Sequence, residues 1–476
     1  METFIGRKQE LMDFRRLLNT GASEFVAVYG RRRVGKTFLI REAFNNNFDF
    51  YITGMANVSL ATQLANFHLA ISKYAPPGMT ISPASNWLTA FHQLSLILEN
   101  QKKGKKVVFL DELPWLDTAK SEFIQALEYF WNSWASARKD VLLIVCGSAA
   151  SWMINKLIHS NGGLYNRVTH RVKLEPFTLN ECEQYFKSRS EAFNDRYQIV
   201  QLYMVMGGIP FYLKQVDTSM SAAQNINNLC FQPGGILYDE FDALYRSLFN
   251  KSEHHMAIIE VLSKKARGLT RDELIASSKT STGGSTTRIL SELEESNFIR
   301  KYNSYGKKGK GSLFQLTDFY SLFYLKFIKS KDVLDENHWM AGLNTPKQHA
   351  WAGYAFEQVC LAHLPQIKKG LGISGIQSAA SSWIGGSGPR GAQIDLVLDR
   401  SDRVINLFEM KFSIDTFAID KKCADDLRKK ISVFREVTKT RKAIFLTMIT
   451  TFGLKMNTHA MSTVQNELTM EDLFAQ

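Results

Sequence analysis

One run of eight residues combines glycines, a lysine and a threonine at a spacing that suits phosphate binding. It follows the pattern GxxxxGK[ST] and reads Gly30-Arg31-Arg32-Arg33-Val34-Gly35-Lys36-Thr37. The glycines let backbone N–H groups curl around an anion, the lysine neutralises β- and γ-phosphates, and the threonine hydroxyl binds Mg²⁺. An apolar strand pattern precedes the run, and a helical pattern that begins with Phe38 follows it. The positive end of that helix would face the same anion, so the run predicts a site for ATP and Mg²⁺.

Two adjacent acids follow a second apolar run. Asp111 and Glu112 come directly after VVFL, which is typical of a buried strand. A carboxylate at the carboxyl end of such a strand suits the second magnesium anchor, so Asp111 and Thr37 are the predicted metal ligands there. Glu112 is predicted to activate water as a general base, with Lys36 as the catalytic cation. The pair favours ATP hydrolysis over binding alone, and the alternative is a solvated strand end that carries two acids.

A second set of carboxylates with a lysine lies in the last third of the chain. Glu409 and Lys411 occur in LFEMKF, and Asp395 lies on the preceding strand pattern, joined through DRSDR. Residues two apart on a strand share a face, so Glu409 and Lys411 would project together beside Asp395. Asp395 and Glu409 could hold Mg²⁺ or Mn²⁺, with Glu357 from a helix as a further catalytic ligand. Lys411 could position water and stabilise charge on phosphorus; the alternatives are a surface hairpin or a fold without activity.

A basic loop predicts contact with a polyanion. The segment KKGKG joins two short strand patterns after three short helical ones, which is typical of a winged helix-turn-helix. Its lysines suit backbone phosphates: Lys307, Lys308 and Lys310. The candidate recognition helix carries Arg288 but also acids that repel DNA: Glu292, Glu294 and Glu295. A protein–protein spacer is therefore an alternative. The glycine-rich loop before Asp395 adds Arg390 as a candidate phosphate contact.

Composition limits the classes of protein to consider. The chain has 476 residues and a formal net charge of +12, which favours several domains and a partner such as DNA, bound without sequence preference. The five cysteines form no CxxC pair, so neither a zinc site nor a disulfide framework is expected. No stretch approaches the ~20 apolar residues of a membrane span. A charged N-terminus, METFIGRKQE, is unlike a signal peptide. We expect a soluble, cytoplasmic protein, and a homo-oligomer stays open.

The sequence patterns of the segments that must position these residues predict an α/β multidomain chain. Apolar strands alternate with helical patterns in residues 1–175, which indicates a parallel-sheet P-loop core. Residues 176–248 read as a helical lid, 249–320 as the winged helix-turn-helix and 321–346 as a helical linker. Residues 347–476 read as a second, smaller α/β domain of the restriction-endonuclease-like kind.

Six segments in the first half resemble the archaeal-type ATPases, a branch of the AAA+/STAND P-loop NTPases. They are FIGRKQEL, GRRRVGKT, VVFLDELPWL, CGSAASWM, RVTHRVKLEPF and GGIPFYL. The resemblance implies that Arg7 lies near the nucleotide and that Ser148 reads the γ-phosphate. It also implies that Gly208 and Pro210 pack against the base.

The same resemblance implies that Arg167 or Arg171 serves as an arginine finger. No second sensor arginine is visible, which argues against ring assembly and motor action. Residues 31 to 33 are three consecutive arginines, for which we expect solvated side chains; the alternative is contact with phosphate or with a neighbouring subunit. The C-terminal set resembles the PD-(D/E)XK nuclease fold, and the region resembles the domain called DUF234, which such ATPases often carry.

These observations predict an ATPase whose nucleotide state controls a nuclease-like, DNA-directed C-terminal domain. Two alternatives differ in class. One is a STAND-type signalling switch that turns over slowly and uses a silent tail to bind a partner protein. The other is a transcriptional regulator that reads DNA with its winged helix.

Overall fold

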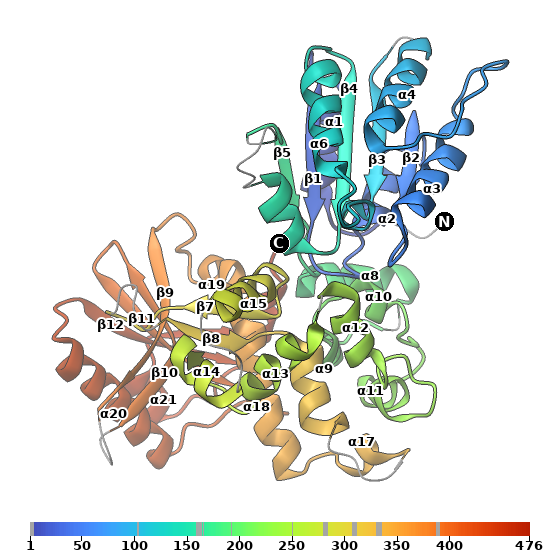
Figure 1. Cartoon of the computed structure of the whole chain (residues 1–476). Coiled ribbons are helices and arrows are strands. Elements are labelled where there is room, and N and C mark those ends of the chain that lie inside the picture. The colour runs from blue at the N-terminus through green and yellow to red at the C-terminus, as the bar shows by residue number, and fades with distance from the viewer. Residues whose placement is uncertain are drawn as a thin grey trace. The chain divides into compact units, whose positions relative to one another are not determined.

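A computed structural model of the chain describes residues 4–101, 104–158, 164, 166–191, 193–249, 251–278, 284–306, 312–329, 336–386 and 391–476. The chain divides into two compact units, Met1–Pro176 and Phe177–Gln476. Figure 1 shows the helices and strands of each unit. The finer five-part division expected from the sequence stays a prediction.

The first unit contains a five-stranded parallel sheet in the order β2-β3-β4-β1-β5. Its strands are β1 (Glu24–Tyr29), β2 (Phe50–Thr53), β3 (Lys106–Asp111), β4 (Val141–Gly147) and β5 (His170–Lys173). Every residue of β3 and β4 is buried, as expected of strands covered on both faces. The predicted parallel α/β sheet is therefore confirmed, and β4 lies between the strands that carry the two predicted phosphate-site motifs.

Helices cover both faces of this sheet (Figure 1). One hydrophobic core joins one face to α3 (Leu60–Ser72), α4 (Trp87–Asn100) and α6 (Phe123–Phe130). On the other face, α1 (Lys8–Leu18) contacts α2 (Lys36–Ala43), with ring centroids 5.6 Å apart between Phe14 and Phe44. The remaining helical segments are α5 (Leu113–Leu116), η1 (Trp131–Ala135), α7 (Ala150–Trp152) and η2 (Met153–Ile158).

The second unit begins with a helical region, as the sequence predicts for this part of the chain. Its helices are α8 (Leu179–Arg189), α9 (Arg196–Met206), α10 (Pro210–Leu213), α11 (Ala222–Phe231) and α12 (Glu240–Leu248). A capping box formed by Thr178 and Glu181 fixes the start of α8. Gly208 has a φ of +64°, and its carbonyl accepts a hydrogen bond from Phe177 N at 2.8 Å. A Cβ at Gly208 would lie 2.1 Å from the Phe177 carbonyl oxygen, so this turn requires glycine.

Three helices and a small antiparallel sheet follow. They are α13 (Ser252–Ser263), β6 (Leu269–Thr270), α14 (Arg271–Ser278), α15 (Gly284–Glu295), β7 (Ile299–Tyr302) and β8 (Leu313–Leu316), with the sheet in the order β6-β8-β7. After them come α16 (Phe319–Phe323), η3 (Tyr324–Ile328) and α17 (His338–Ala341). The wing lysines 307, 308 and 310 lie outside the described residues. The winged-helix assignment of these elements stays a prediction.

The chain ends in a mixed sheet with the order β13-β12-β11-β10-β9. Its elements are α18 (Pro346–Ala362), α19 (Leu364–Gly370), β9 (Ser378–Gly385), β10 (Ala392–Arg400), β11 (Val404–Lys411), α20 (Lys421–Thr438), β12 (Ala443–Thr450), α21 (Thr458–Thr463), β13 (Asn466–Thr469) and η5 (Met470–Phe474). Strands β9 to β11 pair antiparallel, and β11 to β13 pair parallel. Strands β9 and β13 were not predicted, and Arg390 lies outside the described residues.

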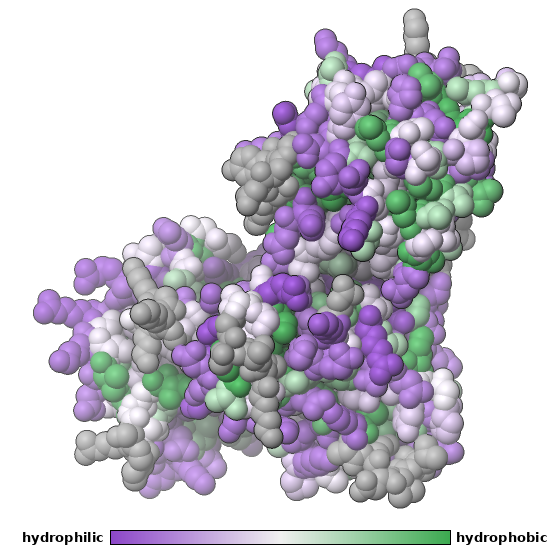
Figure 2. Space-filling model, viewed as in Figure 1, coloured by the Kyte–Doolittle hydropathy of each residue, from purple (hydrophilic) through white to green (hydrophobic). Residues whose placement is uncertain are grey.

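The surface is mixed in character. Figure 2 shows that hydrophilic side chains dominate the face in view and that apolar ones lie in small, separate patches. Scattered apolar residues of this kind are normal for a protein in water. Among the described residues, no helix has both the length and the apolar character needed to cross a bilayer.

Candidate functional site

The loop between β1 and α2 has a backbone that requires glycine at both ends. Gly30 has a φ of +144°, and a Cβ there would lie 2.3 Å from the carbonyl oxygen of Leu174. Gly35 has a φ of +93° and directly precedes α2, which begins at Lys36. Residues with side chains rarely adopt these angles, so the two glycines set the loop's path and the direction in which the helix starts.

Lys36, the first residue of α2, directs its amine against this loop and is only 5% exposed. Its Nζ donates to the carbonyl oxygens of Gly30 at 3.0 Å and Arg31 at 2.8 Å. Burial lowers the pKa of the Lys36 amine, while nearby Glu112 and Asp111 oppose that shift. An ammonium held by carbonyl oxygens in a dry loop can exchange them for phosphate oxygens, which carry more charge.

The two predicted magnesium ligands are in direct contact. Thr37 Oγ1 donates to Asp111 at 3.0 Å to Oδ2 and 3.2 Å to Oδ1. Burial raises the pKa of Asp111, and the neighbouring Glu112 raises it further. A hydroxyl and a carboxylate at this spacing suit a hard cation such as Mg²⁺, which would offset the cost of burying the carboxylate. The residues present therefore fit the expected ion.

Glu112 and Ser148 form the second pair of the site. Ser148 Oγ donates to Glu112 Oε1 at 2.7 Å, and Ser148 N donates to Oε2 at 3.2 Å. The pair forms because β4, which ends just before Ser148, runs beside β3. The family resemblance implied a γ-phosphate contact for Ser148, and the sequence pattern predicted a water contact for Glu112. Neither predicted the hydrogen bonds from the serine to the glutamate. The two donors fix the orientation of this carboxylate, and its role as a general base stays a prediction.

The arginines around the loop differ in environment. Arg31 is 3% exposed, so the expectation of three solvated arginines is wrong for this one; Arg32 and Arg33 are half-buried. Arg31 is buried because it lies just after the end of β1, which is an interior strand of the sheet. Arg7 is also buried and donates to the backbone oxygen of Glu175.

The remaining predicted contacts lie at the surface or in the second unit. Phe38 is 47% exposed and stacks on Phe4, with centroids 5.8 Å apart. Arg167 and Arg171 are both exposed, and Arg171 lies on β5 at the edge of the sheet. Pro210 begins α10 in the second unit. The nucleotide roles of Phe38 and Pro210, and the choice of an arginine finger, stay predictions.

The C-terminal set meets across two neighbouring strands. Leu396 pairs with Phe408, one residue from Asp395 on β10 and from Glu409 on β11. Lys411 Nζ lies 2.8 Å from Glu409 Oε1, and Lys430 Nζ of α20 lies 2.6 Å from Oε2. Burial alone would raise the pKa of Glu409, but the two lysines outweigh it and lower that pKa. The expected shared face of Glu409 and Lys411 is therefore observed, with Lys430 as an additional partner.

Glu357 projects from α18 toward the same carboxylates. Burial first, and then the charges of Asp395 and Glu409, raises the pKa of Glu357 to about 8. This carboxyl therefore keeps its proton to a higher pH than an ordinary glutamate does. In the part of the chain that the structure describes, no group of three or more His, Cys, Asp or Glu side chains is arranged to hold a metal ion. The predicted metal role of Glu357, Asp395 and Glu409 thus stays a prediction.

A cavity of about 130 Å³ opens beside Glu357 and Asp395. Its opposite wall comes from the small antiparallel sheet and includes Arg300 and Tyr302 of β7. The sequence assigned no role to these two residues. Their only signal was the alternation of FIRKY, which indicates a strand but not its neighbour.

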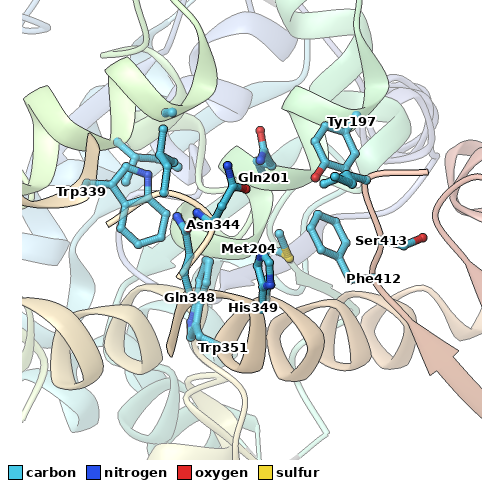
Figure 3. A pocket seen from close by; sticks show the side chains of 15 residues that line it. Tyr197, Gln201, Met204, Trp339, Asn344, Gln348, His349, Trp351, Phe412 and Ser413 are labelled. Atoms are coloured by element: carbon cyan, nitrogen blue, oxygen red, sulfur yellow. Dashed lines mark hydrogen bonds between the residues drawn. The ribbon is translucent and has the colours of Figure 1, made fainter. Parts of the chain in front are cut away.

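A larger cavity of about 310 Å³ is lined by α9 and α11 of the helical region, by α17 and α18, and by the segment that follows β11. Figure 3 shows its aromatic walls, with Trp339 at one end and Tyr197 facing Phe412 at the other. The rings of Tyr197 and Phe412 stack with centroids 5.3 Å apart. Phe412 directly follows Lys411, so this cavity and the carboxylate–lysine set share the end of β11.

The parallel sheet, its glycine-bounded loop and the Lys36, Thr37–Asp111 and Glu112–Ser148 contacts define a P-loop ATPase domain. Residues 4–216 match the family described as ATPase domains predominantly from Archaea, so this part of the chain is similar to those ATPase domains.

Two relatives come from Methanocaldococcus jannaschii. An uncharacterized protein is 23% identical over 432 residues, which is 90% of this chain and 91% of the relative. An uncharacterized ATP-binding protein is 44% identical over 43 residues, which is 9% of this chain and 73% of the relative.

Solved structures give weaker similarities. The Walker-type ATPase of Pyrococcus abyssi has a TM-score of 0.48 at 18% identity and covers 68% of this chain and 96% of its own. The ORC2 protein of Aeropyrum pernix has a TM-score of 0.34 at 15% identity, with 66% and 92% covered.

Proposed function

We propose that this chain hydrolyses ATP and that its nucleotide state controls a nuclease-like, DNA-directed C-terminal domain. The ATP part of the proposal is supported by the ATPase family and by the Lys36, Thr37–Asp111 and Glu112–Ser148 contacts. A general base beside a magnesium site supplies what hydrolysis needs. The net charge of +12 supports a polyanionic partner.

The observation that carries the control step is the attachment of the first helix after the ATPase unit to the C-terminal domain. Leu179 N, at the start of α8, donates to His363 Nε2 at 2.9 Å, and His363 directly follows α18. Asn180 donates to the backbone oxygen of Phe474 at 2.9 Å. Because α8 is hydrogen-bonded to both ends of the C-terminal domain, a nucleotide-dependent movement of α8 would be transmitted to that domain.

For the small antiparallel sheet and its three helices we propose a winged-helix fold that serves first as a spacer. Arg288 on α15 is 70% exposed, and its Nε lies 3.6 Å from Glu292 Oε1, so a phosphate would compete with that carboxylate for the guanidinium. Glu292, four residues further on, is 19% exposed, and its Oε2 also accepts a hydrogen bond from His255 Nε2 at 2.8 Å. A regulator that reads a DNA sequence remains the less favoured role, since one exposed arginine supplies a charge but not a pattern of base contacts.

The competing function is a switch with a silent, partner-binding tail. Both oxygens of Glu409 contact lysine ammonium groups, so its charge is already compensated by two cations that would repel a metal ion. That arrangement does not show a ready metal site. When bound, Mg²⁺ or Mn²⁺ would supply a Lewis acid and an activated water, and Asp395 and Glu409 would be its ligands, with Lys411 beside them.

Cleavage of labelled single-stranded, duplex and branched DNA would separate the two functions. The native chain is compared with K411A, K36A and K429A under Mg²⁺ or Mn²⁺, with and without ATP. Lys429 is an exposed lysine of α20 and controls for loss of one positive charge. We expect cleavage that K411A abolishes, that K36A makes insensitive to ATP and that K429A retains. Intact ATP hydrolysis without cleavage of any substrate would instead establish the silent-tail switch.

A further inference from the structure

The small antiparallel sheet is joined to the C-terminal sheet within the second unit. Ser304, just after β7, forms a parallel bridge with Ser382 of β9, and Tyr305 N donates to the Ser382 carbonyl at 2.7 Å. The ring of Tyr305 also lies 5.1 Å from that of Phe434 on α20. These contacts hold β7 against the domain that carries the carboxylate–lysine set.

The face of β7 that meets this domain carries a cation. Arg300 and Tyr302 are two residues apart and therefore project to the same side of the strand. Both line the 130 Å³ cavity whose other wall includes Glu357 and Asp395. The chain thus places a guanidinium across a small cavity from two of the predicted catalytic carboxylates.

Arg300 is held in a fixed orientation. Its Nε donates to Gln315 Oε1 of β8 at 2.8 Å, and its Nη2 donates to the same oxygen. The guanidinium carbon of Arg300 also lies 5.5 Å from the centroid of the Tyr302 ring. A guanidinium has five N–H donors, so the two bonds to Gln315 leave three for a ligand.

The size and chemistry of the cavity limit what it can accept. At about 130 Å³ it has room for about four water molecules at roughly 30 Å³ each. Whole small molecules need pockets of about 300–1,000 Å³, so a single group must enter while the rest of the ligand stays outside. The planar fork of an arginine suits the oxygens of a phosphate, and partial burial strengthens the attraction.

We propose that Arg300 binds a backbone phosphate of DNA at the C-terminal site, so that β7 completes this site from outside the nuclease-like domain. The proposal rests on the proposed function, because it assumes that DNA is the ligand of this domain. It adds a phosphate-binding residue that belongs to neither the ATP site nor the carboxylate–lysine set.

The test measures binding of a fluorescein-labelled duplex and a single strand of mixed sequence by anisotropy. The full chain is used in Ca²⁺, with the K36A substitution in every sample to remove the nucleotide phosphate site. R300Q is compared with R300K and with K301Q. Lys301 is the next residue on β7, is exposed and projects to the opposite face, where its Nζ lies 6.0 Å from the Phe314 ring centroid.

We expect R300Q to weaken DNA binding by about tenfold. The slope of the logarithm of the binding constant against the logarithm of the salt concentration should become shallower by about one, as expected for the loss of one phosphate contact. R300K should recover part of the affinity because it keeps the charge, and K301Q should bind like the parent. Thermal unfolding of each variant checks that losing the bond to Gln315 has not unfolded the sheet.

Three results would overturn the assignment. Parent and R300Q binding DNA equally would remove Arg300 from the site while leaving the proposed function intact. Equal weakening by R300Q and K301Q would show a general charge effect. No DNA binding by the parent protein would refute the proposed function itself, and the role of Arg300 with it.

Discussion

His363 must be neutral for the second unit to keep its observed contacts. Its Nε2 accepts from Leu179 N at 2.9 Å, so Nδ1 carries the proton and donates to the Val359 carbonyl at 2.8 Å. The side chain is 1% exposed, and burial lowers its pKa to about 4. Protonation of Nε2 would bury a charge and also remove the acceptor at the start of α8.

The sign and size of the effect follow from this pKa. The folded value of about 4 lies below the ordinary value of 6.5, so in that interval the unfolded chain binds more protons. The free energy of unfolding therefore falls as the pH falls from 6.5 toward 4. The whole shift corresponds to about 3 kcal/mol, and roughly 2 kcal/mol of it is lost between pH 7 and pH 5.

Urea unfolding followed by tryptophan fluorescence at pH 7 and pH 5 tests this reasoning with H363Q. Glutamine keeps an oxygen acceptor for Leu179 N but does not titrate, so the native chain should lose about 2 kcal/mol more than H363Q on acidification. H254Q, which replaces an exposed histidine of α13, should behave like the native chain. The same loss for native and H363Q proteins would refute the assignment of the acid sensitivity to His363.

Two further predictions concern the ATPase unit. E112Q should lower the rate of phosphate release from ATP by about 10²–10⁴-fold while nucleotide binding is kept. S148A removes the hydroxyl that orients the carboxylate but keeps the carboxylate itself, so it should lower this rate less. Equal losses in the two variants would contradict separate roles for Glu112 and Ser148. G30A should lower the free energy of unfolding by more than about 1 kcal/mol, because its Cβ would lie 2.3 Å from the Leu174 oxygen. G21A, whose Cβ would meet no atom within 4 Å, should change it by less than about 0.5 kcal/mol, and calorimetry showing equal losses would argue against strain at Gly30.

The ATP site was predictable because its chemistry is local in sequence. Lys36 and Thr37 belong to one contiguous run, and the run of apolar residues before Asp111 marks a strand without further information. Parallel strands place their carboxyl ends on one edge of the sheet, so contact between Thr37 and Asp111 follows from the fold class. The bond from Ser148 to Glu112 needed the strand order, which the pattern of apolar runs does not encode.

The C-terminal site was predictable only in part. Alternation on a strand was enough to put Glu409 and Lys411 on one face, and the hairpin connection put Asp395 beside them. Lys430 reaches Glu409 from a helix that follows later in the chain, and Arg300 reaches the cavity from far earlier in it. No sequence motif marks either residue. Packing between segments that are distant in the sequence determines which lysine or arginine becomes partly buried, and local patterns do not show that packing.

The bridge between Ser304 and Ser382 also affects how the chain can be divided. Strand β9 is the edge of the C-terminal sheet, and the segment after β7 contacts that edge. An uncovered edge strand offers its N–H and C=O groups to other molecules and promotes aggregation. A recombinant fragment starting at residue 347 would lose that cover together with Arg300. We therefore expect the whole second unit, Phe177–Gln476, to be the fragment that folds with this edge covered.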